Sequence, residues 1–335
     1  MSMGTENEVD VPRIKSFILG FKKETNKHKK QKMTKDQILK QIKKDKVLYM
    51  LLLIPIIYFI VFKYIPMSGI VLAFRRYDVG GSMFGSEWVG LKYFNMFLND
   101  PYFWKVFKNT FVLSLGSLLI GFPIPIILAL MLNEVQSPLF KRSIQTISYL
   151  PKFFSTVVVV SMISIMLSPS SGVVNSVLAN LGIEEIYFLK ETEWFRPVYI
   201  ISEVWQFTGW NAILYIAALT NIDPQLYEAA SIDGANRWIR MLKVTIPGIM
   251  PTIAITLILS TGSILSVGFE KVLLLYNNST MEVADVIQTY VYRMGIISSN
   301  YSYSTAVGLF QAVINLGLIS LVNYISKKTT DTGLW

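Results

Sequence analysis

The sequence predicts an all-α integral membrane protein with six transmembrane helices, and three observations support this fold class. Hydrophobic residues make up 52% of the 335 residues and charged residues only 16%, whereas a typical soluble domain is about 25% charged. The apolar residues form long runs, and a helix needs about 20 mostly apolar residues to cross the hydrocarbon core of a bilayer. These runs lack the alternation of apolar and polar residues that strands of a membrane β-barrel show. The composition therefore argues against a soluble enzyme.

Cysteine and histidine content excludes several kinds of site. The chain has no cysteine and one histidine, His28, which lies in a lysine-rich segment. It therefore has no disulfide framework, no thiolate nucleophile, and no zinc site built from cysteines or from a pair of histidines. We expect no catalytic residue and no metal ligand in this chain.

Six apolar segments satisfy the length requirement for a transmembrane helix. We expect spans at about 47–66, 108–133, 144–168, 196–220, 248–269 and 304–326, within a transmembrane domain of residues 47–327. Prolines occur inside several of these runs, for example Pro55 and Pro151. They are tolerated where neighbouring helices or waters satisfy the freed backbone groups.

Residues 1–46 form a basic tail with 13 Lys and Arg against 6 Asp and Glu. Beside a membrane span, such a tail indicates a cytoplasmic anchor to anionic lipid rather than a nucleic-acid site. Without the tail, Lys and Arg are balanced between the two sides, so the tail alone orients the chain with both termini, including 328–335, in the cytoplasm. Segment 36–46 places apolar residues on one helical face, which favours a helix on the inner membrane surface; a solvated basic linker is the alternative.

Between the fourth and fifth spans, residues 221–247 read NIDPQLYEAASIDGANRWIRMLKVTIP. The pattern predicts two short helices separated by a break at Asp233 and Gly234, because glycine reaches positive φ without steric cost. Pro247 marks the beginning of the next span. We expect this segment to form a compact knob on the cytoplasmic side.

This knob resembles the EAA loop of binding-protein-dependent ABC importers. The matching residues are Glu228-Ala229-Ala230, then Asp233-Gly234-Ala235, and finally Pro247. Residues 242, 244 and 246 are Leu, Val and Ile where the family pattern favours Phe, Ile and Leu. The outer stretch 89–110, VGLKYFNMFLNDPYFWKVFKNT, is similar to a segment of carbohydrate-uptake permeases, and the resemblance covers about residues 47–327.

The resemblance implies a type I ABC importer fold in which 221–247 is a coupling helix that fits a cleft of a cytosolic ATPase. Small side chains at Ala229, Ala230 and Ala235 would allow the ATPase to approach closely. Glu228 would be the polar anchor, with a solvated surface position as the alternative. For Asp233, capping of its own turn is as good an expectation as contact with the partner.

The chain lacks the G-x-x-x-x-G-K-[ST] phosphate loop, so we expect a translocation subunit that is not itself an enzyme. ATP and magnesium would bind the partner ATPase, and no cofactor would bind this chain. The implied partners are a second homologous permease, a cytosolic ATPase dimer, an extracellular solute-binding protein, a carbohydrate and membrane lipid, but no nucleic acid. The expected location is the plasma membrane of a Gram-positive bacterium, as a multi-pass protein.

Polar and aromatic residues inside the spans are candidates for a sugar pathway, because polar groups in a bilayer are costly. The candidates are Glu203, Trp205, Gln206, Trp210, Asn211, Gln311 and Asn315. Packing by Trp205 and interhelical hydrogen bonds from Gln311 and Asn315 are the alternatives. Gly308 and Gly317 are expected to permit close helix packing.

The sequence disfavours two other classes of function. An ion-gradient-driven secondary transporter is the alternative to an ABC importer, but such carriers usually have inverted repeats, more spans and buried ionisable couplers. In this sequence only Glu203 is an acidic residue well inside a predicted span. A membrane-embedded enzyme is disfavoured because no catalytic constellation is visible.

Overall fold

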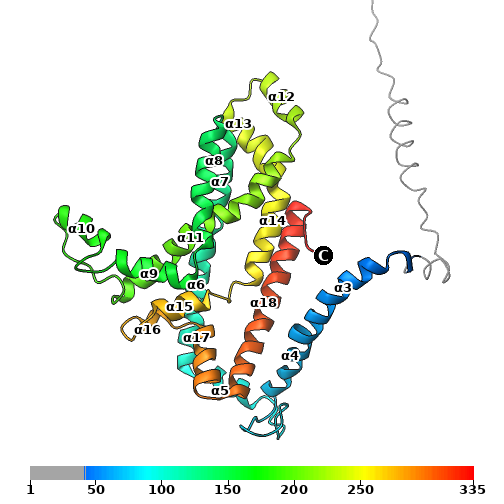
Figure 1. Ribbon diagram of the computed structural model, residues 1–335, viewed down its shortest axis with the longest axis vertical. Coiled ribbons are helices and arrows are strands. Elements are labelled where there is room, and N and C mark those ends of the chain that lie inside the picture. The colour runs from blue at the N-terminus through cyan, green and yellow to red at the C-terminus, as the bar shows by residue number, and fades with distance from the viewer. Residues whose placement is uncertain (1–40, 42) are drawn as a thin grey trace, which may run out of the picture. The chain divides into compact units, whose positions relative to one another are not determined.

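The computed structural model describes residue 41 and residues 43–335, which are helical apart from turns, loops and one isolated β-bridge between Arg75 and Trp88 (Figure 1). Most of the basic tail, including residues 36–40 of the helix predicted at 36–46, lies outside the described residues. The chain divides into two compact units, one ending at Met67 and one comprising Ser68–Trp335.

The described part of the first unit is a run of helix with three segments. These are α3 (Lys46–Phe59), a π-helical turn η1 (Ile60–Tyr64) and α4 (Ile65–Met67). Large apolar side chains such as Leu51 and Phe62 are exposed along it. This is the composition expected of a helix that faces lipid.

The second unit contains the remaining helices. They are α5 (Lys92–Leu98), α6 (Pro101–Gly121), α7 (Pro123–Glu134), α8 (Pro138–Tyr149), α9 (Thr156–Met166), α10 (Val173–Asn180), α11 (Thr192–Thr220), α12 (Pro224–Ile232), α13 (Arg237–Arg240), α14 (Ile246–Gly262), α15 (Phe269–Leu275), α16 (Met281–Ala284), α17 (Ile287–Tyr292) and α18 (Tyr301–Thr330). Short 3₁₀ segments cover η2 (Ser68–Ala73) and η3 (Leu150–Phe153), and π-helical turns cover η4 (Met241–Thr245) and η5 (Arg293–Ile297).

Four helical runs in the described residues are long and apolar enough to cross a membrane. They are Lys46–Ala73, Pro101–Glu134, Arg237–Gly262 and Tyr301–Thr330, and the bent pair Pro138–Phe153 with Thr156–Met166 would be a fifth. Helix α11, which contains the predicted fourth span, is 29 residues long but carries more polar residues. An all-α membrane protein is therefore confirmed, while the boundaries of the six spans remain predictions.

The segment predicted as the third span, 144–168, contains a bend of 102° between Pro138–Phe153 and Thr156–Met166. Phe154 and Ser155 have extended backbone angles. The hydroxyl of Ser155 accepts a hydrogen bond from the Val158 N–H at 3.3 Å and so begins α9 as a new helix. The first helix of the pair ends in the 3₁₀ turn that holds Pro151.

Helix α11 lies at the centre of the second unit and packs against α6, α7, α8 and α14, while α14 runs beside α18 (Figure 1). One cluster of buried side chains joins α7, α11 and α14 through Ala129, Tyr215 and Ile249. A second, aromatic cluster contains Phe97 of α5, Phe103 of α6, Tyr290 of α17 and Tyr303 of α18. These contacts fix the helices that surround the cavity described below.

Glycines permit close helix packing at other positions than those predicted. A Cβ on Gly116 would approach Ile200 to 2.8 Å, and one on Gly262 would approach Ile319 to 2.7 Å. Within the described residues, Gly308 and Gly317 have no neighbour within 4 Å of such a Cβ. The prediction that these two glycines permit close packing was therefore wrong, because α18 meets α14 through Ile319 instead.

Candidate functional site

The predicted knob is formed by α12 and α13, which lie together at one end of the second unit (Figure 1). The carboxylate of Asp223 caps α12 by accepting a hydrogen bond from the Gln225 N–H at 2.9 Å. At the other end, Gly234 has φ +77°. The Ala235 N–H then donates to the Ala230 carbonyl at 2.9 Å. This Schellman ending requires the left-handed conformation that glycine adopts at little cost.

Side-chain hydrogen bonds set the angle between the two short helices. Asn236 caps α13 by accepting from the Ile239 N–H at 2.9 Å. Arg240 of α13 donates to the Ser231 hydroxyl of α12 at 2.9 Å. The hydroxyls of Tyr227 and Thr245 lie 3.1 Å apart and connect α12 to the π-helical turn that leads into α14. The knob is therefore joined by defined contacts, rather than by a loose loop, to α14, whose helical run is long and apolar enough to cross a membrane.

The knob presents apolar side chains on its surface. Ile232 is 87% exposed and Trp238 is 71% exposed. Glu228 and Ala229 are also exposed, and the Glu228 carboxylate makes no hydrogen bond or ion pair to any described residue. Large exposed apolar side chains on the same segment as an unpaired carboxylate are typical of a protein-interaction surface.

The remaining knob residues predicted from the sequence lie at the C-terminal end of α12 and at the beginning of α14. Ala230 and Ala235 are half-buried and supply the two ends of the Schellman hydrogen bond. Asp233 is the last residue before Gly234, and its carboxylate makes no hydrogen bond within the described part of the chain. Pro247 is in the first turn of α14, where a missing N–H is not costly.

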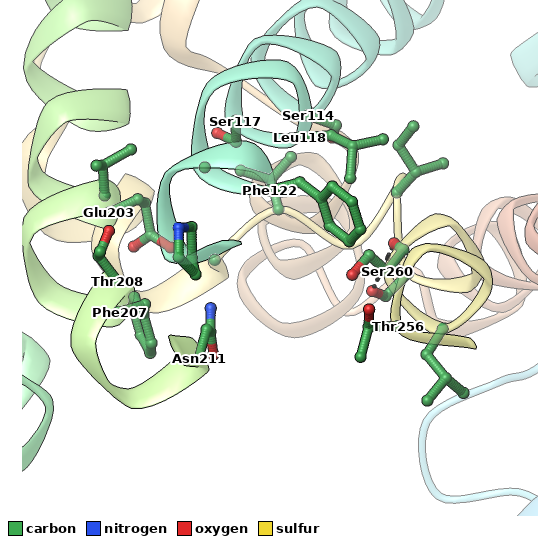
Figure 2. A pocket seen from close by; sticks show the side chains of 18 of the residues that line it. Ser114, Ser117, Leu118, Phe122, Glu203, Phe207, Thr208, Asn211, Thr256 and Ser260 are labelled. Atoms are coloured by element: carbon green, nitrogen blue, oxygen red, sulfur yellow. Dashed lines mark hydrogen bonds between the residues drawn. The ribbon is translucent and has the colours of Figure 1, made fainter. Parts of the chain in front are cut away.

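A cavity of about 500 Å³ lies between α6, α11, α14 and the loop 263–268. Figure 2 shows Glu203, Phe207, Thr208 and Asn211 on one side of it, and Thr256 and Ser260 on the opposite side. The lining also includes the hydroxyl residues Ser114, Ser117, Ser263 and Ser266. Among the described residues that line the cavity, Glu203 is the only charged one.

Glu203 is paired with a lysine behind the cavity wall. Its Oε1 lies 2.5 Å from Nζ of Lys271 on α15, and the lysine side chain is only 3% exposed against 27% for the glutamate. The Lys271 ammonium also donates to Oε1 of Gln206 at 2.8 Å. Burial lowers the pKa of Lys271, and the neighbouring Glu203 carboxylate opposes that shift.

A second lysine approaches the same wall. Nζ of Lys152 lies 4.3 Å from the centroid of the Phe207 ring, and Nζ of Lys271 lies 5.7 Å from it. Lys152 is half-buried and forms no ion pair with any described carboxylate. The sequence pattern does not mark either lysine as a site residue. The available signal was the position of each lysine, one inside a predicted span and the other just beyond the end of one.

The structure brings two of the predicted pathway residues, Glu203 and Asn211, to the lining of this cavity. Gln206 is buried beside Lys271, with its amide also donating to the Phe154 carbonyl at 3.4 Å. Trp205 lines a separate, apolar pocket between α9 and α11. Trp210 packs edge-on against Phe153, with ring centroids 5.9 Å apart.

Gln311 and Asn315 of α18 hold the loop that follows α14. Gln311 Nε2 donates to the Leu265 carbonyl at 2.8 Å, and Oδ1 of Asn315 accepts from the Leu265 N–H at 3.3 Å. These contacts tie α18 to the backbone that closes one side of the cavity. A role of either residue in contacting substrate remains a prediction.

A buried carboxylate organises the segment between α15 and α18. Asp285 is 1% exposed and accepts hydrogen bonds from the Tyr102 hydroxyl at 2.6 Å and from Arg293 Nη2 at 2.6 Å. Thr289 donates to its other oxygen at 2.7 Å. The hydrogen bond to Asp285 raises the pKa of Arg293. This cluster has its donors and acceptors satisfied, and it connects α6 to α17.

Comparison with protein families and curated proteins gives consistent matches. A family model described as "binding-protein-dependent transport system inner membrane component" matches residues 121–331. The polygalacturonan/rhamnogalacturonan transport system permease protein YteP of Bacillus subtilis (strain 168) is 44% identical over 328 residues, covering 98% of this chain and 99% of that protein. Protein LplB of the same strain is 46% identical over 294 residues, covering 88% of this chain and 92% of that protein.

Solved structures show the same likeness. A chain from the crystal structure of a bacterial ABC transporter involved in the import of the acidic polysaccharide alginate aligns with a TM-score of 0.81 and 45% identity, covering 88% of this chain and 99% of that chain. A chain of the bacterial alginate ABC transporter in complex with an alginate pentasaccharide-bound periplasmic protein aligns with the same TM-score, 0.81, and identity, 45%. The fold class predicted from the sequence is confirmed by these matches.

Proposed function

Because the chain belongs to the family of binding-protein-dependent transport system inner membrane components, we propose that it is the permease subunit of an ABC importer for acidic oligosaccharides. It is a multi-pass membrane protein of a transporter family. The observation that carries the proposed substrate is the likeness, along most of the chain, to a chain of an importer of the acidic polysaccharide alginate. The relative YteP is also named for polymers that contain galacturonic acid, whose C6 carboxylate is ionised at neutral pH.

The knob supports the proposal that ATP is hydrolysed by a separate cytosolic ATPase dimer. The exposed side chains of Ile232 and Trp238 would enter a groove of the ATPase, and the unpaired Glu228 would meet a basic group there. The hydrogen bonds at Ser231 and Thr245 would pass the movement of the knob to α14. Nucleotide and magnesium belong to that partner in this proposal.

The cavity supports a sugar as the transported molecule. Its lining presents hydroxyl groups from α6 and α14 and the amide of Asn211, all of which can exchange hydrogen bonds with sugar hydroxyls. Phe207 and Phe122 add aromatic surface for the C–H faces of a pyranose ring. A second homologous permease would complete the pathway, and an extracellular binding protein would deliver the oligosaccharide.

Uptake by the reconstituted importer tests this proposal. Proteoliposomes would contain this chain, its partner permease and the ATPase, with the binding protein outside and ATP inside. We expect uptake of labelled trigalacturonate that requires ATP and the binding protein and that vanadate inhibits. Uptake driven by a proton gradient without ATP would contradict the proposal and favour an ion-coupled secondary transporter. ATP-dependent uptake restricted to neutral oligosaccharides would contradict the proposed substrate class.

A further inference from the structure

Three charged side chains surround Phe207 on the wall of the cavity. Glu203 lines the cavity, Lys271 is bonded to it from behind, and Lys152 lies against the Phe207 ring. One carboxylate and two ammonium groups leave a net charge of +1 at this point. Within the described residues, no further carboxylate pairs with Lys152 or Lys271. The wall therefore has one positive charge in excess.

We propose that the wall around Phe207 is a subsite for one sugar carboxylate. Lys152 would bind this carboxylate, while Lys271 balances the charge of Glu203. The inference rests on the proposed function, because an acidic oligosaccharide is what would bring a carboxylate into the cavity. The subsite explains how a cavity whose lining carries a glutamate can accept an anionic chain.

The two lysines have different roles because their surroundings differ. Lys271 is 3% exposed and already donates to Glu203 and Gln206, so its ammonium is held in place behind the wall. Without it, Glu203 would present an uncompensated negative charge to the cavity and repel a second carboxylate. Lys271 is thus a positioning residue that sets the charge of the wall.

Lys152 has the freedom to bind a ligand. Its side chain is half-buried, and its described electrostatic contact is with the face of the Phe207 ring. An ammonium has three N–H donors on a flexible four-carbon stem. Lys152 is not itself among the residues that line the cavity, so in this proposal its side chain extends past Phe207 to the carboxylate. The sugar hydroxyls would then meet Thr208 and Asn211, which lie with Phe207 on one side of the cavity (Figure 2).

Substitutions can change the charge of this wall in steps. Lys152→Met and Lys271→Met each lower the net charge of the three side chains from +1 to 0, counted from the residue types at positions 152, 203 and 271. Glu203→Gln raises it to +2, and Glu203→Gln combined with Lys271→Met restores +1. If the wall acts through its charge, the double variant should behave as the wild type does.

The test compares an acid with its neutral methyl ester on the assembled importer in detergent, without binding protein or nucleotide. Trigalacturonate and its fully methyl-esterified form have the same length and differ in charge, and their binding would be measured by isothermal titration calorimetry. We expect the wild type to bind the acid about tenfold more tightly than the ester, the size of one charge-assisted hydrogen bond. Lys152→Met and Lys271→Met should lose this preference, Glu203→Gln should keep or increase it, and the double variant should regain it.

Lys190→Met is the matched control, because Lys190 also lies over an aromatic ring, that of Tyr187 at 5.6 Å, and Tyr187, unlike Phe207, is not among the residues that line the cavity. It should keep the full preference. Retention of the full preference by Lys152→Met, or failure of the double variant to regain it, would overturn the inference. Ester binding reports whether each variant is folded, and Lys152→Met, at a half-buried position, carries the test if Lys271→Met does not assemble.

The two proposals fail in different ways. If the importer takes up trigalacturonate with ATP but binds acid and ester equally, the carboxylate subsite is wrong and the proposed function stands. If it neither binds nor takes up trigalacturonate, the proposed substrate class is wrong, and the subsite with it.

Discussion

Gly209 of α11 lies directly against the backbone of Ser148 in α8, so that a Cβ at position 209 would clash with the Ser148 carbonyl oxygen. Backbone atoms cannot move aside as the end of a flexible side chain can. The crossing of α8 and α11 therefore depends on the absence of a side chain at this position.

We predict that Gly209→Ala lowers the free energy of unfolding by about 3 kcal/mol, because the added methyl group must push two helices apart. Gly317→Ala is the control, since a Cβ there has no neighbour within 4 Å and alanine favours the helix. Thermal unfolding of the purified protein in detergent measures both. Equal melting temperatures for the two variants would contradict the close approach at Gly209.

The Schellman ending of α12 gives a prediction about coupling. Gly234→Ala should cost about 1 kcal/mol because φ is +77° there, and Gly234→Pro should disrupt the knob because proline fixes φ near −65°. We expect Gly234→Pro to abolish stimulation of the ATPase by the loaded binding protein. Gly182→Ala is the control for Gly234→Ala, because Gly182 has nearly the same backbone angle, φ +76°, but lies between α10 and α11. It should leave that stimulation intact.

Glu228 has an unpaired carboxylate at the surface of the knob, which gives a direct test of its predicted role as an anchor. Glu228→Gln should weaken binding of the ATPase by about tenfold, the loss expected for one charge-assisted hydrogen bond. The Kd would be measured by titrating ATPase onto immobilised permease. Glu185→Gln, a neutralised glutamate exposed between α10 and α11, should leave the Kd unchanged. An unchanged Kd for Glu228→Gln would instead favour a solvated surface position.

Neutralising the buried carboxylate of Asp285 should lower the stability of the protein more than neutralising an exposed carboxylate. Asp285→Asn leaves Arg293 and Tyr102 without their charged acceptor, and we expect it to lower the free energy of unfolding by about 3 kcal/mol. This is the lower end of the range for breaking a buried ion pair, because Arg293 is partly exposed. Asp78→Asn removes an exposed partner of Arg76 and should change stability by less than about 1 kcal/mol. Denaturation in detergent compares the two variants, and similar losses would contradict the proposed importance of burial.

Local features of this protein could be predicted from the sequence. The apolar runs predicted an all-helical membrane protein, and the break at Gly234 followed from the conformational freedom of glycine. The resemblance identified the knob because its residues are close together along the chain. In each case the relevant interactions lie within a few residues of one another.

Features that depend on helix rotation and long-range packing could not be predicted. Lys271 and Glu203 are far apart in the sequence, and nothing in either segment shows that they meet. Whether Asn211 or Trp210 faces the cavity depends on how α11 is turned against α6 and α14. The bend before α9 is set by the extended backbone at Ser155, which an average over an apolar run does not detect.

The π-helical turn at Met241–Thr245 holds one residue more than an α-helical turn would hold between α13 and α14. Such a turn commonly arises where one extra residue is inserted into an α-helix. Removing one residue here would restore regular α-helical winding and leave the direction of α13 nearly unchanged, because the wider π turn advances less per residue and so absorbs the extra one. A single-codon deletion at this position should thus leave the knob aimed as before, whereas the same deletion in the regular turns of α14 would rotate the knob by about 100°.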